Sequence, residues 1–149
     1  MFDLDEALAA IEGARAAADL PIVLTFSFDR GDPQKGYRTL MGVSPGRAAE
    51  AVAAMDLLAL GANCGRGLDG YERVLADLAP AVPLVAKFNA GVPRVEDGYT
   101  VYDMAPLAMA SRSSELLLAA RGFMGIAVTH YDSGELDTAI GQELLRARL

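Results

Sequence analysis

The stretch MDLLALGANCG, residues 55–65, decides the fold that we predict for this chain. Its first half is apolar enough to form a buried strand, and runs of this kind are typical of parallel strands covered on both faces. Its second half places the thiol of Cys64 between two glycines, where the strand should pass into a loop. A cysteine in such a loop can meet a metal or a substrate, or it can pack beneath the loop as a small buried hydrophobe.

Helical and strand patterns alternate on both sides of this stretch. Helices are expected over residues 4–18, 45–55, 68–78, 103–121 and 136–149. Strands are expected over residues 22–28, 57–62, 83–88 and 124–129. Polar loops are expected over residues 29–43 and from the end of the third strand to about residue 102. Successive strand-helix units of this length predict an α/β fold with a right-handed parallel sheet or part of a barrel, in one domain over residues 1–149.

The composition limits the partners and the location. A formal net charge of −7 argues against nucleic acid and anionic membrane surfaces, because both need a basic face. No stretch approaches the roughly 18 apolar residues of a membrane span, and the acidic start of the chain lacks the basic region of a signal peptide. The single cysteine excludes an internal disulfide and fits a reducing compartment. We expect a cytoplasmic protein with small molecules and proteins as partners.

Two short motifs at predicted strand ends carry a resemblance to a known family. They are GANCG at residues 61–65 and NAGVP at residues 89–93, with weaker support from RTLMG at residues 38–42. In this order and at this spacing they resemble the homocysteine S-methyltransferase family, which includes betaine-homocysteine methyltransferase and the homocysteine domain of cobalamin-dependent methionine synthase. The resemblance covers nearly the whole chain but only the second half of the family's (β/α)₈ barrel. It therefore implies parallel βα units that correspond to barrel strands five to eight.

The resemblance also implies a metal site. In the family three cysteine thiolates hold a zinc ion, which keeps the sulfur of homocysteine ionised and able to accept a methyl group. Cys64 matches the first zinc ligand. The adjacent cysteine pair is absent, because that place reads His130-Tyr131, and His130 is the implied replacement ligand. Asn63 and Asn89 are implied to position a small thiol substrate.

Each of these residues also has a structural interpretation. His130 is the only histidine, and a lone histidine commonly serves as a hydrogen-bonded structural residue. Asn63 and Asn89 can satisfy backbone groups in turns, and Asp29 and Asp32 can either shape the first long loop or contact a substrate.

Three hypotheses follow for the whole chain. The first is a zinc-dependent enzyme, or a piece of one, that transfers a methyl group to a thiol and converts homocysteine to methionine. The second is a non-catalytic half-barrel module for binding or assembly, and the third is a decayed gene product. Because an opened barrel leaves two unpaired strand edges, we expect a homodimer or a partner chain that completes the barrel. A neighbouring reading frame that encodes the first half would favour a split enzyme.

Overall fold

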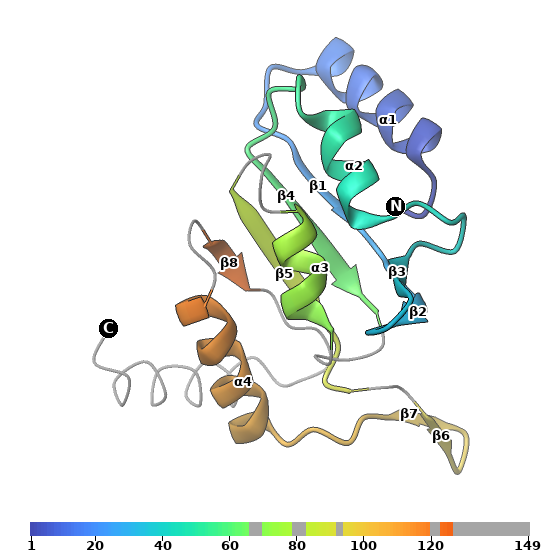
Figure 1. Cartoon of the computed structure of the whole chain (residues 1–149), viewed down its shortest axis with the longest axis vertical. Coiled ribbons are helices and arrows are strands. Elements are labelled where there is room, and N and C mark those ends of the chain that lie inside the picture. The colour runs from blue at the N-terminus through green and yellow to red at the C-terminus, as the bar shows by residue number, and fades with distance from the viewer. Residues whose placement is uncertain (66–69, 79–82, 92–93, 120–122, 127–149) are drawn as a thin grey trace.

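In the computed structural model the described residues are 1–65, 70–78, 83–91, 94–119 and 123–126 (Figure 1). The helices in this part of the chain are α1 (Leu4–Ala17), α2 (Pro45–Val52), α3 (Tyr71–Leu78) and α4 (Pro106–Ala119). The strands are β1 (Val23–Phe26), β2 (Arg30–Asp32), β3 (Gly36–Arg38), β4 (Ala59–Cys64), β5 (Leu84–Phe88), β6 (Arg94–Glu96), β7 (Tyr99–Val101) and β8 (Phe123–Ile126).

The main sheet is parallel and has the strand order β1-β4-β5-β8. Each strand of this sheet therefore lies beside the next one along the chain, and the order never reverses. Helices α2 and α3, which connect β1 to β4 and β4 to β5, lie over the same face of the sheet (Figure 1). The prediction of an α/β fold with a parallel sheet is confirmed. All strands of the sheet point the same way, so their carboxyl ends meet at one edge.

The hydrophobic core lies between the sheet and these helices. The strand side chains Phe26, Leu60 and Phe88 are fully buried there, and α3 adds Leu78. Strands β4 and β5 approach each other closely at Gly61, where an added Cβ would lie 1.8 Å from the carbonyl oxygen of Val85. Only glycine fits this contact, so Gly61 sets the close pairing of the two strands that carry the sequence motifs.

The start of the chain lies along the outer edge of β1. The amino group of Met1 donates a hydrogen bond to the carbonyl oxygen of Thr25 (2.8 Å), and the N–H of Ser27 donates to the carbonyl oxygen of Met1 (3.0 Å). This is the pattern of a parallel bridge opposite Phe26. Helix α1 follows at once, with the side chain of Asp3 accepting a hydrogen bond from the N–H of Glu6 as its N-cap.

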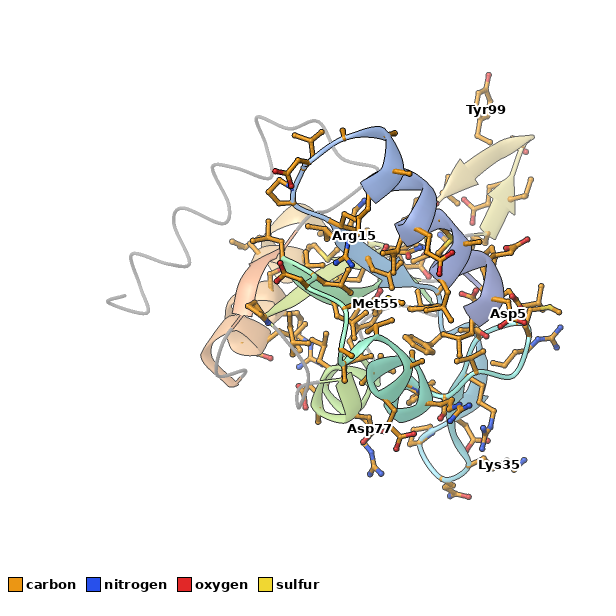
Figure 2. All side chains as sticks on the ribbon, turned by 90° about the horizontal axis from the view of Figure 1, so that it is seen from above. Asp5, Arg15, Lys35, Met55, Asp77 and Tyr99 are labelled. Carbon is orange, nitrogen blue, oxygen red and sulfur yellow. The ribbon has the colours of Figure 1, made fainter. Side chains whose placement is uncertain are left out.

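Two hairpins occupy the segments predicted as loops. Strands β2 and β3 pair across a turn in which the carboxylate of Asp32 accepts hydrogen bonds from the N–H groups of Gln34 and Lys35. Strands β6 and β7 pair across Asp97 and Gly98, which have φ values of 49° and 83°. The second hairpin projects from the body, and Tyr99 points away from it (Figure 2). Strands of three residues are too short to show a period in the sequence.

Element boundaries also differ from the prediction. The predicted strand at 57–62 begins and ends two residues later, so Cys64 is the last residue of β4 and not part of the loop. The helix predicted over residues 103–121 begins only at Pro106, as α4, and Asp103 before it forms an ion pair with Arg94. The predicted helix 136–149 lies outside the described residues. Within the described ranges, no helix has the length and apolar character that crossing a membrane requires.

Candidate site at the carboxyl edge of the sheet

Cys64 ends β4 in an unusual backbone conformation. Its φ is 56°, in the left-handed region that non-glycine residues rarely occupy, and Gly65 follows with a φ of 73°. Two consecutive left-handed residues turn the chain sharply away from the strand. As a result, the thiol of Cys64 is exposed at the edge of the sheet instead of packing in the core. Left-handed residues of this kind occur preferentially at functional sites.

Asn63 directs its amide at this thiol. Its Nδ2 donates a hydrogen bond to the Sγ of Cys64 over 3.3 Å. The other amide atom, Oδ1, is buried and has no hydrogen-bond partner, the one such side-chain atom in the described part of the chain. A buried acceptor without a donor costs roughly 1–3 kcal/mol, so this oxygen is a candidate to accept a hydrogen bond from a ligand.

Tyr71, the first residue of α3, holds the ends of β4 and β5 together. Its hydroxyl donates to the carbonyl oxygen of Cys64 (3.1 Å) and makes a longer contact with that of Lys87 (3.4 Å). Its ring packs edge-on against Phe88, with the ring centroids 5.4 Å apart. Burial, and then the nearby Cys64 and Asp29, raise the pKa of Tyr71 far above its ordinary value. The phenol therefore stays protonated and remains a hydrogen-bond donor.

The end of β1 brings a carboxylate to the same region. Asp29 lies three residues beyond β1, and its Oδ2 accepts a hydrogen bond of 2.7 Å from the hydroxyl of Ser27, which is buried. After burial, the charges of Cys64 and Asp29 are the further causes of the raised pKa of Tyr71. For Asp29 the sequence left two roles open, turn formation and substrate contact. For Tyr71 the sequence gave no indication of a role at the site, because a single tyrosine in an amphipathic helix is typical of a core residue.

Asn89 follows β5 directly at the same edge. Cys64 pairs with Phe88 in the register of β4 and β5, so Asn89 lies one residue beyond the level of the thiol. The residue is buried, with 8% of its surface exposed. Lys87, directly opposite Asn63 in the same register, is exposed. The structure thus brings Asn63, Cys64 and Asn89 to one edge, while His130 lies outside the described residues.

A separate cleft of about 750 Å³ opens at the amino ends of the strands. It is lined by residues that precede β1, β4 and β5, including Arg15, Asp19, Leu58 and Pro83. In parallel α/β sheets ligands bind at the carboxyl ends of the strands, so we take the Cys64 edge, and not this cleft, as the candidate site.

Metal ligands are sparse in the part of the chain that the structure describes. No three side chains of histidine, cysteine, aspartate or glutamate gather there closely enough to hold a metal ion by themselves. Cys64 is a soft thiolate donor of the kind that zinc prefers, and its sulfur already accepts an N–H from Asn63. The donor chemistry at Cys64 therefore fits zinc, provided that further ligands join it.

A parallel α/β sheet with a free thiol at its carboxyl edge defines a class of proteins whose chemistry resides in the loops that follow the strands. The chain belongs to the homocysteine S-methyltransferase family, whose pattern it matches over residues 1–130. The match includes Asn63, Cys64 and Asn89 and ends at His130. A search among curated proteins finds no individual match.

Proposed function

We propose that this chain transfers a methyl group to a small thiol, with homocysteine as the acceptor and methionine as the product. The observation that carries the proposal is the exposed thiol of Cys64, turned out of β4 by two left-handed residues and hydrogen-bonded by the amide of Asn63. A structural cysteine packed under a loop would need neither feature. Membership of the homocysteine S-methyltransferase family supplies the reaction class.

In this proposal Cys64 and His130 are zinc ligands. When zinc is bound, it keeps the acceptor sulfur ionised near neutral pH while leaving it nucleophilic. The N–H of Asn63 stabilises negative charge on the sulfur of Cys64, because hydrogen bonds to a ligand atom orient it and tune its basicity. Asn89 positions the acceptor from the next strand. A free thiol with this role requires a reducing compartment, so we place the chain in the cytoplasm.

We further propose that the sheet is the second half of a (β/α)₈ barrel. Its strands follow one another in chain order, and α2 and α3 lie over one face (Figure 1). A doubly wound sheet would instead reverse its strand order and carry helices on both faces. A half barrel lacks part of the substrate pocket, so a second copy or a partner chain completes it in this proposal.

The alternative is a non-catalytic half-barrel module for binding or assembly. Its specific support is the incompletely paired edge of β1, which Met1 bridges only at Phe26 and where Val23 is 47% exposed. An apolar edge strand invites pairing with another chain whether or not chemistry is retained. The absence of the family's cysteine pair also fits a module that kept the fold and lost the reaction.

The test combines metal content with ligand discrimination. Zinc is measured by elemental analysis on the purified chain and on Cys64→Ala, and calorimetry compares homocysteine with homoserine, in which a hydroxyl replaces the thiol. We expect about one zinc per chain, binding of homocysteine but not homoserine, and loss of both zinc and binding in the variant. Mass spectrometry then detects methionine formed with methyl-sulfonium and methyl-ammonium donors. Zinc content that is unchanged in Cys64→Ala, or equal binding of the two ligands, contradicts the proposal and favours the module.

A further inference from the structure

The cleft at the amino ends of the strands is built from three segments that precede β1, β4 and β5. Hydrogen bonds hold these segments together. The N–H of Leu58, before β4, donates to the carbonyl oxygen of Ile22, before β1 (2.9 Å). Arg15 reaches from α1 to the segment before β4, where its Nη2 donates to the carbonyl oxygen of Asp56 over 2.9 Å (Figure 2). The cleft is therefore formed in advance, as most small-molecule sites are.

This cleft carries charges of both signs that do not pair with each other. Arg15 supplies a guanidinium group, and Asp19 and Asp56 supply two carboxylates. The guanidinium donates only to a backbone carbonyl, which leaves most of its five N–H donors unused. In the described part of the chain neither carboxylate takes part in an ion pair or a hydrogen bond. All three groups are available to a ligand.

The position of the carboxylates favours a bound cation. Helix α1 ends at Ala17, and Asp19 follows it by two residues. The carboxyl end of a helix carries partial negative charge, which adds to that of the carboxylates. Arg15 provides the opposite charge in the same cleft. A ligand that complements all of these groups has one positive and one negative end.

Apolar side chains make up much of the remaining lining. Leu20, after α1, is 71% exposed and Leu58 is 47% exposed, with Pro21 and Pro83 beside them. Covering these side chains with an apolar group is favourable, because their surface is removed from water. The volume of about 750 Å³ lies within the usual range of small-molecule sites, roughly 300–1,000 Å³. The ligand therefore has an apolar body between or beside its charged ends.

We propose that this cleft binds a small zwitterion with an apolar body, the chemical class of the α-amino acids with aliphatic side chains. Arg15 binds the carboxylate of the ligand, Asp19 and Asp56 bind its ammonium group, and the two leucines cover its side chain. Reacting groups of parallel α/β proteins gather at the carboxyl ends of the strands, so the ligand binds at this opposite end without reacting. The inference does not rest on the proposed function.

The experiment measures the binding of three probes to the full chain by calorimetry. L-Leucine carries both charged groups, isocaproate lacks the ammonium group, and isoamylamine lacks the carboxylate. The variants are Asp56→Asn, Arg15→Gln and Arg15→Lys. Glu12→Gln is the matched control, because it removes a charge from α1 outside the cleft. Cys64→Ala is included to detect binding at the other end of the strands, and thermal denaturation verifies that each variant is folded.

We expect L-leucine to bind, and each analogue to bind at least about tenfold more weakly, because a charge-assisted hydrogen bond is lost at one end. Asp56→Asn and Arg15→Gln should weaken the binding of L-leucine by a similar factor. Arg15→Lys should recover part of it, since lysine keeps the charge but not the planar fork. Glu12→Gln and Cys64→Ala should bind L-leucine as the wild type does.

Four results would each overturn the inference. They are the absence of L-leucine binding, an analogue that binds as tightly as L-leucine, wild-type affinity in Asp56→Asn, and loss of binding in Cys64→Ala. The last result would move the ligand to the carboxyl edge of the sheet. None of the four bears on zinc content, which tests the proposed function separately.

Discussion

At Gly61 the backbones of β4 and β5 are so close that a side chain of any size is excluded. The nearest atom to an added Cβ is the carbonyl oxygen of Val85, which belongs to a strand in the middle of the sheet and cannot move aside. The same residue starts the GANCG motif, so the contact that fixes the sheet also fixes where Asn63 and Cys64 emerge. At the residue scale, structure and site thus depend on one glycine.

We predict that Gly61→Ala lowers the free energy of unfolding by about 3 kcal/mol, because the added methyl group overpacks the contact between the two strands. The control is Gly13→Ala in α1, where an added Cβ meets nothing within 4 Å. Alanine there should raise stability by about 1 kcal/mol through helix propensity. Urea denaturation of both variants measures the difference. Equal stability of Gly61→Ala and the wild type would refute the close contact.

Among the elements, α3 has a role beyond covering the sheet. Its first residue, Tyr71, reaches over the edge and bonds to the carbonyl group of Cys64, the last residue of β4, with a longer contact to that of Lys87, the last but one of β5. An edge-on ring contact with Phe88 fixes the direction of the hydroxyl. The helix therefore holds the strand ends in the arrangement that places Asn63, Cys64 and Asn89 together. Its buried face explains the amphipathic pattern, but the hydroxyl contact has no counterpart in that pattern.

We predict that Tyr71→Phe lowers stability by about 1 kcal/mol, since the partly buried hydrogen bond to the carbonyl oxygen of Cys64 is lost while the ring contact remains. Tyr99→Phe on the projecting hairpin is the control, because Tyr99 is 75% exposed and should change stability by less than about 0.5 kcal/mol.

The measurement is urea denaturation at several pH values. Because the pKa of Tyr71 is raised in the folded state, its contribution is complete below pH about 10 and is lost as the pH rises further. Wild-type stability should therefore fall more steeply above pH 10 than that of Tyr71→Phe. Identical profiles would contradict the burial of this phenol.

On the scale of the whole molecule, the parallel sheet has an incompletely paired edge at β1. Met1 bridges it at Phe26, but the backbone groups of Val23, which face the same side, have no partner among the described residues. The side chain of Val23 is 47% exposed and that of Leu20, just before the strand, is 71% exposed. An edge with these properties can pair with a strand of another chain.

We predict that the chain self-associates or binds a partner through this edge, and that Val23→Lys prevents it, because a charged side chain on an edge strand disfavours strand pairing. Val95→Lys is the matched control, since Val95 is a 75% exposed valine on the projecting hairpin. Size-exclusion chromatography with light scattering should show a larger species for the wild type and Val95→Lys, and a monomer for Val23→Lys. Equal masses for all three would argue against the β1 edge.

Sequence alone determined the class of the fold and the family, and it predicted the edge of the sheet where we place the candidate site. Long apolar runs such as residues 57–62 and 83–88 predict parallel strands, and the glycine-rich stretches that follow them indicate loops at their carboxyl ends. Local chemistry suffices for these predictions, because hydrophobic period and glycine position are properties of neighbouring residues. The short hairpins were missed for the same reason, since three-residue strands carry no period.

Only the tertiary structure decided which side chains face one another. The structure shows the amide of Asn63 donating to the sulfur of Cys64 and the hydroxyl of Tyr71 donating to the carbonyl oxygen of Cys64. It also shows the carboxylate of Asp29 accepting from Ser27, in the segment that follows β1. The sequence places Asp29 35 positions before Cys64 and gives no reason to join them. The register of the parallel strands joins them, and register is set by the packing of the whole sheet against its helices.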